Sequence, residues 1–213
     1  MKTLTKEMQS EITPKRGLDL LKEGNKRFVD NLKINRNLLQ QANDTSDGQH
    51  PFAIILSCID SRTSAELIFD QGLGDIFSIR IAGSIVNDDI LGSMEFGCKI
   101  AGAKIIIVLG HTKCGAIKGA CDQIELGHLT ELLKKINPAI CDEKSVTENR
   151  CSANDEFVEK VSAINIKKTV DFIMEHSPIL KELIDSGQCG IAGGYHNIAT
   201  GEVSFFDDTI HID

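Results

Sequence analysis

The sequence reads PFAIILS at residues 51–57, DIFSIRI at residues 75–81 and KIIIVLG at residues 104–110. These short apolar runs are rich in β-branched residues, as are strands that are buried on both faces. Helical patches separate them, SAELIFDQ at residues 64–71 and DDILGSMEFGCKIAG at residues 88–102. The alternation predicts an α/β fold in which a mostly parallel β-sheet is flanked by helices.

The remainder of the chain continues this pattern and ends in two late strands, of which we expect the last to be an antiparallel edge strand. We predict helices over residues 115–136, 157–176 and 178–186, a polar surface loop over residues 137–155, and strands in QCGIAGGYH (188–196) and GEVSFF (201–206).

An amphipathic helix is predicted ahead of the sheet, over residues 13–33. Thr13 can cap it, Pro14 suits its first position, and Leu18, Leu21, Phe28 and Leu32 recur at helical spacing. Its apolar face needs a partner, which is either the domain body or another subunit. Because no repeat or separating linker is evident, we predict a single domain over residues 1–213, with an N-terminal helical arm (1–48) and an α/β core (49–213).

The composition excludes several classes of function. A formal net charge of −8 argues against nucleic-acid binding, which depends on clustered basic residues, and favours a small-molecule substrate. Seven cysteines without regular spacing do not resemble a secreted disulfide framework. The first residues have no apolar signal segment, and no run is long enough to span a membrane. We therefore expect a cytoplasmic protein without a membrane partner.

Residues able to carry chemistry follow two of the predicted strands. Cys58, Asp60 and Arg62 alternate directly after the first run, and on an extended backbone their side chains share one side. His111 and Cys114 follow the third run, and the carboxyl ends of parallel strands are where ligands bind. Two thiolates and an imidazole form a zinc ligand set that leaves the fourth tetrahedral position open, which is typical of catalytic zinc.

Other interpretations of these residues remain open. The two cysteines could be buried packing thiols, with the aspartate and arginine forming a plain ion pair. The chain could also be an inactive zinc-binding module, although a purely structural site favours a fourth Cys or His ligand over such a pair. A redox switch predicts a resolving cysteine close in sequence, and none is present. We interpret the other cysteines as packing or surface thiols: Cys98, Cys121, Cys141, Cys151 and Cys189. We assign no role to the other histidines: His50, His128, His176, His196 and His211.

The C-x-D-x-R and H-x-x-C-G motifs on such a sheet resemble those of the β-carbonic anhydrases, and the resemblance extends over residues 13–206. It implies that Cys58, His111 and Cys114 bind one zinc ion per chain. It implies that Asp60 and Arg62 form a dyad that orients the attacking hydroxide. The implied reaction is the reversible hydration of carbon dioxide to bicarbonate and a proton. Relatives on the same fold hydrolyse carbonyl sulfide or carbon disulfide, and these activities are the alternatives.

The same resemblance implies a set of substrate-binding residues. Gln49 matches a glutamine that hydrogen-bonds substrate, Phe77 matches a phenylalanine of the apolar cleft, and the backbone N–H of Gly115 is placed beside the metal. Three positions depart from the family pattern, because Ala82 replaces a common valine of the cleft, Ser84 replaces a common asparagine, and Phe96 replaces a tyrosine of plant-type members. We count Ala82 and Phe96 among the substrate-binding residues.

Regulation and assembly are also implied by the resemblance. One subgroup of the family has a bicarbonate-binding triad, for which Arg80 matches the arginine but Ile55 replaces the tryptophan, so we do not expect that regulation. We accordingly expect Asp60 to pair with Arg62 at neutral pH. Because clefts of the family lie at dimer interfaces, we expect a homodimer or homotetramer in which the helix over residues 14–32 wraps a neighbour.

Overall fold

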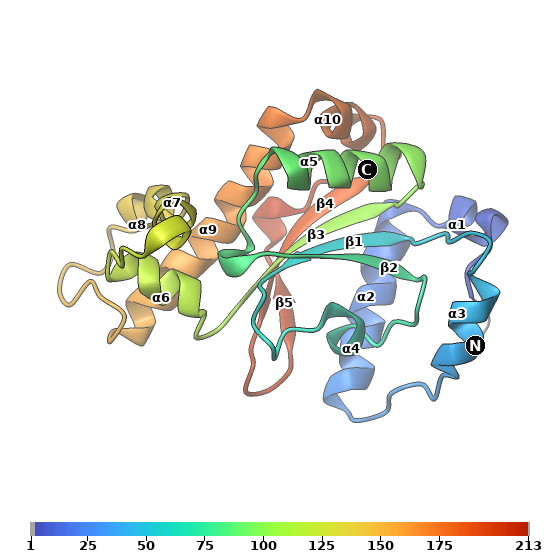
Figure 1. Cartoon of the computed structure of the whole chain (residues 1–213), viewed down its shortest axis with the longest axis horizontal. Helices are drawn as coiled ribbons and strands as arrows, with labels where there is room; N and C mark the ends of the chain where they lie inside the picture. The colour runs from blue at the N-terminus through green and yellow to red at the C-terminus, as the bar shows by residue number, and fades with distance from the viewer. Residues whose placement is uncertain (1–2, 213) are drawn as a thin grey trace.

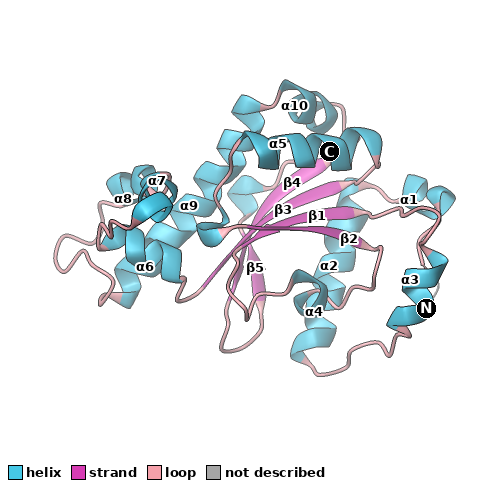
Figure 2. Ribbon diagram, in the orientation of Figure 1, coloured by secondary structure: helices cyan, strands magenta, loops and turns pink. Residues whose placement is uncertain are grey.

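The structure is a computed structural model that describes residues 3–212. Its centre is a five-stranded sheet with the order β2-β1-β3-β4-β5 (Figures 1 and 2). The strands are β1 (Ala53–Ser57), β2 (Ile76–Arg80), β3 (Ile105–His111), β4 (Gly190–His196) and β5 (Val203–Phe205). The first four strands are parallel and β5 is antiparallel to β4, which confirms the predicted sheet and its antiparallel edge.

Helices surround this sheet and account for most of the remaining described chain. They are α1 (Lys6–Glu11), α2 (Pro14–Val29), α3 (Leu38–Asp44), α4 (Ala65–Ile68), α5 (Asp88–Glu95), α6 (Gly115–Cys121), α7 (Gly127–Lys134), α8 (Asn137–Asp142), α9 (Asp155–His176) and α10 (Pro178–Asp185). A π-helical turn, Phe96–Ile100, extends α5. Within residues 3–212, no helix is both long and apolar enough to cross a membrane.

Two predictions about the middle of the chain are wrong in detail. The helix expected over residues 115–136 is interrupted between α6 and α7, where Gln123 and Gly127 have positive φ angles of 54° and 45°. The loop expected over residues 137–155 begins with α8, because Ala139 is buried beside Phe157 in an apolar cluster. A helix this short has little stability of its own, so its tertiary contacts determine it and local polarity hides it.

The core lies on both faces of the sheet because alternate residues of each strand point in opposite directions. On β1, Ile54 and Leu56 pack with residues of α5, α9 and α10, whereas Ala53 and Ile55 pack with residues of α2 and α4. Figures 1 and 2 show α5 and α10 on one side of the sheet and α2 and α4 on the other. The central strands are therefore buried on both faces, as their apolar runs predicted.

Helix α2 confirms the predicted N-terminal helix. Thr13 caps it through a hydrogen bond from the backbone N–H of Arg16. Its apolar residues Leu18 and Leu21 are buried against the sheet of their own chain, so this part of its apolar face packs on the domain body, and contact with a neighbour remains a prediction. The helix lies so close to the end of α4 that a Cβ atom on Gly24 would be 1.8 Å from the carbonyl oxygen of Phe69.

A buried ion cluster ties the segment after α2 to the body of the protein. The carboxylate of Asp70 accepts hydrogen bonds from the guanidinium groups of Arg27 and Arg36 and from the backbone N–H of Ile34. The side chain of Asp70 is only 3% exposed, and that of Arg36 only 6%. Burial acts to raise the pKa of Asp70, but these hydrogen bonds outweigh it and hold the pKa below its usual value.

Candidate metal centre

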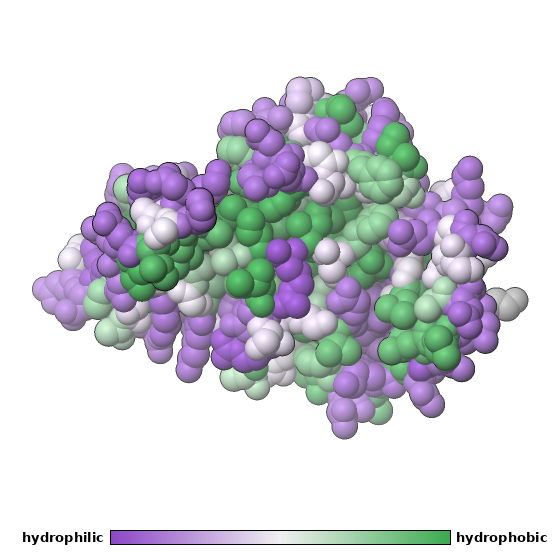
Figure 3. Space-filling view, in the orientation of Figure 1, coloured by the Kyte–Doolittle hydropathy of each residue, from purple (hydrophilic) through white to green (hydrophobic). Residues whose placement is uncertain are grey.

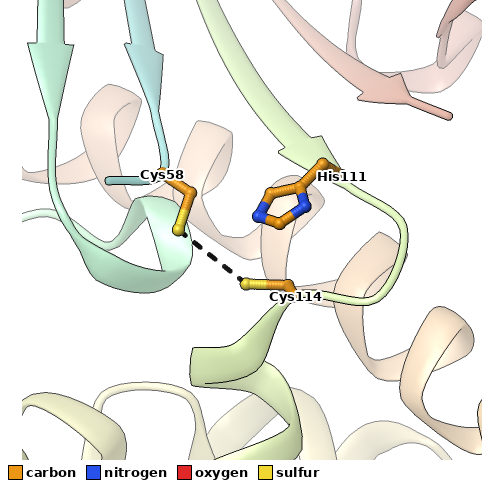
Figure 4. Close-up of side chains that lie close together, drawn as sticks. All are labelled: Cys58, His111 and Cys114. Atoms are coloured by element: carbon orange, nitrogen blue, oxygen red, sulfur yellow. Dashed lines mark hydrogen bonds between the residues drawn. The ribbon is translucent and has the colours of Figure 1, made fainter. Parts of the chain in front are cut away.

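The C-x-D-x-R and H-x-x-C-G motifs meet at the carboxyl ends of two parallel strands. Strands β1 and β3 are parallel neighbours with Ser57 opposite Leu109, so Cys58 follows β1 close to the point where His111 ends β3. Cys114 precedes the first residue of α6. The ligand atoms of Cys58, His111 and Cys114 all lie within 4.8 Å of one another, and all three side chains are buried (Figure 4).

The imidazole of His111 has one nitrogen available to a ligand. Its Nδ1 lies 2.9 Å from the carbonyl oxygen of Thr112, so the proton resides on Nδ1 and is donated to that carbonyl. Its Nε2 is buried and has no hydrogen-bond partner among the described residues. A histidine whose far nitrogen donates to a carbonyl while the other presents a lone pair is arranged as metal-binding histidines are.

The two thiols share one short contact, with Cys58 Sγ and Cys114 Sγ 4.0 Å apart. A hydrogen bond from the Cys114 thiol, with a smaller contribution from His111, lowers the pKa of Cys58 to about 4. The same contact with Cys58, together with burial, raises the pKa of Cys114. A bound cation would favour the loss of the protons of both thiols.

These donors fit a zinc ion. The set consists of two sulfur atoms and one imidazole nitrogen, which is a known zinc ligand combination, and the orphaned Nε2 of His111 would gain a partner. The residues present could hold the metal through three protein ligands, and this number leaves one tetrahedral position for a small molecule.

Beside this cluster, Asp60 and Arg62 form a bidentate ion pair. Arg62 donates from Nε to Oδ1 of Asp60 at 2.9 Å and from Nη2 to Oδ2 at 2.7 Å, and its backbone N–H also donates to Oδ1 at 2.9 Å. Mainly because of these bonds, the pKa of Asp60 lies well below its usual range. The ion pair that we expected is present, but the alternation argument for it is wrong, because β1 ends at Ser57 and the chain turns after Cys58.

Two predicted cleft residues lie together, and two lie next to the cluster. Phe77 and Phe96 line a groove of about 630 Å³ whose lining includes none of the cluster residues. Ala82 is the first residue of a short helical turn, Ala82–Ser84. In this turn the backbone N–H of Gly83 forms a hydrogen bond with the sulfur of Cys58 and helps to lower its pKa. Gly115 is exposed, and no heavy atom lies within 4 Å of the position that a Cβ atom would take there, so space is open beside Cys114.

Gln49 is not brought to the cluster within one chain. It is exposed and precedes β1, whereas Cys58 follows β1. The five extended residues Ala53–Ser57 cover about 16 Å, so Gln49 and Cys58 lie at opposite ends of β1. A contact between Gln49 and a substrate at the cluster would require a second copy of the chain.

His196 lies beside the cluster, although we assigned it no role from the sequence. It ends β4 directly opposite His111 on β3, it is buried, and neither of its ring nitrogens has a hydrogen-bond partner among residues 3–212. Burial, and secondarily the charge of His111, lower its pKa to about 4, so its ring is neutral at pH 7. Its place at the carboxyl end of the run GIAGGYH was the signal that could have identified it.

Comparison with known proteins assigns the family. The family model described as carbonic anhydrase matches residues 53–203, which is well over half of the chain. This chain belongs to the carbonic anhydrase family. It is 32% identical over 193 residues to carbonic anhydrase 2 of Mycobacterium tuberculosis, an alignment that covers 88% of this chain and 90% of that protein.

Solved carbonic anhydrases share the fold. The β-carbonic anhydrase CcaA superposes with a TM-score of 0.71 at 28% identity, over 91% of this chain and 97% of that chain. A β-carbonic anhydrase of the fungus Sordaria macrospora, one of two described as tetrameric, gives a TM-score of 0.69 at 21% identity, over 78% and 85% of the respective chains. The segment matched by the carbonic anhydrase family model contains the whole cluster and the ion pair, whereas Gln49 precedes it.

Proposed function

We propose that this carbonic anhydrase catalyses the reversible hydration of carbon dioxide with one zinc ion per chain, held by Cys58, His111 and Cys114. The observation that carries the proposal is the buried cluster of two thiols and an unpartnered imidazole nitrogen beside an arginine-held aspartate. The relatives named carbonic anhydrase support the same reaction. Nothing in the structure favours carbonyl sulfide or carbon disulfide as the substrate.

When bound, zinc supplies the acidity that makes water a nucleophile near neutral pH. The protein's own contribution begins with Asp60, which the fork from Arg62 keeps ionised and fixed in direction. Oδ1 accepts two hydrogen bonds, whereas Oδ2 accepts only one from the described residues. The free lone pair on Oδ2 can therefore accept a hydrogen bond from the attacking nucleophile, which directs a lone pair of the nucleophile toward carbon dioxide.

Carbon dioxide is small and uncharged, so its binding site should be apolar. Ala82 would supply part of that surface, and the open space beside Gly115 would admit the substrate next to the cluster. Phe77 and Phe96 line a groove that contains no residue of the cluster of their own chain, so they would contribute apolar surface to the site of a second copy. The backbone N–H of Gly115 would then donate to an oxygen of bicarbonate as it forms.

We further propose that the chain acts as a homodimer or homotetramer. Phe96 is 56% exposed and Ile100 is 73% exposed on the same π-helical turn. Figure 3 shows hydrophobic side chains gathered across the middle of the face that this turn borders. A second copy would cover this surface and could supply Gln49 to the site. From the seven cysteines we expect a reducing compartment, the cytoplasm.

The test is an assay of carbon dioxide hydration by stopped-flow pH change. We expect activity in protein that contains about one zinc per chain, its loss after chelation, and its return with added zinc. Cys114→Ala should lose both zinc and activity, whereas Cys121→Ala, which removes a buried thiol outside the cluster, should keep both. Zinc-loaded protein that hydrates no carbon dioxide, or that turns over only carbonyl sulfide or carbon disulfide, would contradict the proposal.

A further inference from the structure

A guanidinium from the neighbouring strand holds the loop that carries Cys58 and Asp60. Arg80 ends β2 and lies opposite Ser57, the last residue of β1. Its Nε donates to the carbonyl oxygen of Cys58 at 3.1 Å, and its Nη2 donates to the carbonyl oxygen of Asp60 at 2.6 Å. One side chain therefore contacts the backbone of a metal-cluster residue and that of the aspartate of the ion pair.

Among the described residues, the carbonyl oxygen of Cys58 has only one donor besides Arg80, and it shares that donor with the carbonyl oxygen of Asp60. The hydroxyl of Thr63 lies 3.2 Å from the carbonyl oxygen of Cys58 and 3.0 Å from that of Asp60, but its single proton can serve only one of them at a time. The backbone N–H of Thr63 also donates to Asp60. Because Arg80 offers a separate N–H to each carbonyl, it fixes both peptide groups at once, with bonds that its charge strengthens.

We propose that Arg80 is a positioning residue for the reaction, acting through the backbone of Cys58 and Asp60. The inference rests on the proposed function, since it assumes that the cluster holds the metal. The fork keeps the turn after β1 in the shape that directs the thiol of Cys58 toward Cys114 and leaves Asp60 paired with Arg62. Small displacements of such groups have large effects on rate and on metal binding.

A lysine at this position would keep the charge but not the fork, because an ammonium group is a point donor on a flexible stem. Arg80→Lys therefore separates geometry from charge, and Arg80→Gln removes the charge. The chain offers a matched control in Arg150, which donates to the carbonyl oxygens of Val146 and Ile140 at 2.7 Å and 2.8 Å, away from the cluster. Arg150→Lys removes the same kind of fork from another loop.

The experiment replaces zinc with cobalt(II) in the full chain and records the visible absorption of the metal, with affinity measured by competition against a chelator. We expect both Arg80 variants to change the cobalt spectrum and to bind the metal at least about tenfold more weakly, with unchanged far-ultraviolet circular dichroism. Arg150→Lys and Thr63→Ser should keep the wild-type spectrum. Hydration activity should fall in the Arg80 variants in parallel.

The outcomes separate this inference from the proposed function. If wild-type protein shows no sulfur-to-cobalt absorption, the metal site is absent and the inference falls with it. If wild-type protein shows that absorption and both Arg80 variants keep it unchanged with full affinity, only the inference is overturned. A normal spectrum in Arg80→Lys alone would also overturn it, since charge and not the fork would then suffice. If Arg80→Gln does not fold, Arg80→Lys decides the question.

Discussion

Asp60 and Arg62 are separated by one residue, yet they meet face to face because the chain turns between them. A strand would have placed them on one side of the sheet at successive alternate positions, with both side chains directed at a ligand and not at each other. Because of this turn, the guanidinium group of Arg62 binds the carboxylate of Asp60 and fixes its orientation. The residue types were readable from the sequence, whereas their mutual orientation depends on where β1 ends.

Asp60→Asn tests the role of this carboxylate. The amide keeps the shape but loses the charge that pairs with Arg62 and accepts the hydrogen bond of the nucleophile, so we expect carbon dioxide hydration to fall at least about a hundredfold. Zinc content, measured by elemental analysis, should stay at the wild-type level. Asp185→Asn, which alters an exposed ion pair with Lys181 elsewhere, should change neither quantity. Near-full activity in Asp60→Asn would contradict the proposed mechanism.

At the scale of elements, short helices and close approaches were the features that the sequence could not reveal. The apolar runs predicted β1, β2 and β3 within two residues at their ends, because burial on both faces of a parallel sheet leaves a clear pattern. Helix α8 was hidden because its stability comes from burial of Ala139 in the apolar cluster that also contains Phe157. His196 was missed because its environment depends on pairing between β3 and β4, which are distant in sequence.

Gly24→Ala tests the close approach between α2 and α4. Helix propensity alone predicts a gain of about 1 kcal/mol for this change. The added Cβ would meet the backbone oxygen of Phe69, which cannot rotate away, so we expect the free energy of unfolding in urea to fall by about 3 kcal/mol or more. Lys26→Ala, at an exposed position of the same helix, should stay within about 0.5 kcal/mol of wild type. A stabilised Gly24→Ala would show that the two helices can separate without cost.

Asp70→Asn tests the ion cluster and its dependence on pH. The change removes the buried carboxylate that pairs with both Arg27 and Arg36, so we expect a loss of about 3–5 kcal/mol in unfolding free energy at pH 7. Because the folded pKa of Asp70 is lowered, its contribution is complete above the unfolded pKa of about 3.9 and disappears as the pH falls through the folded value. The gap between wild type and variant should therefore narrow below about pH 4.

Glu23→Gln is the matched control for that experiment, since the pair Arg16–Glu23 is about half exposed. It should alter the unfolding free energy by no more than about 1 kcal/mol. An Asp70→Asn variant as stable as this control would mean that the cluster does not anchor the segment after α2.

The molecule as a whole presents an apolar surface that a monomer would leave in water. We expect sedimentation velocity at micromolar concentration to show a species of at least twice the 23.3 kDa chain mass. The double variant Phe96→Ser, Ile100→Ser should shift the sedimenting species toward the monomer. Leu126→Ser, which alters an exposed leucine outside this turn, should not. A wild-type protein that sediments as a 23.3 kDa monomer would contradict the proposed assembly.

The order of the strands also bears on how the chain reaches its native state. Helices α6 to α10 separate β3 from β4 in the sequence, so β4 can pair with β3 only after all of them have been synthesised. This pairing closes a long loop, and such long-range parallel contacts slow folding. The three donor residues of the cluster lie earlier in the chain, between Cys58 and Cys114, and the pairing of β1 with β3 brings their ends of the strands together. During synthesis, the residues that would hold a metal ion are thus made well before β4 completes the sheet, and metal binding at that stage would restrain β1 and β3 in their native register.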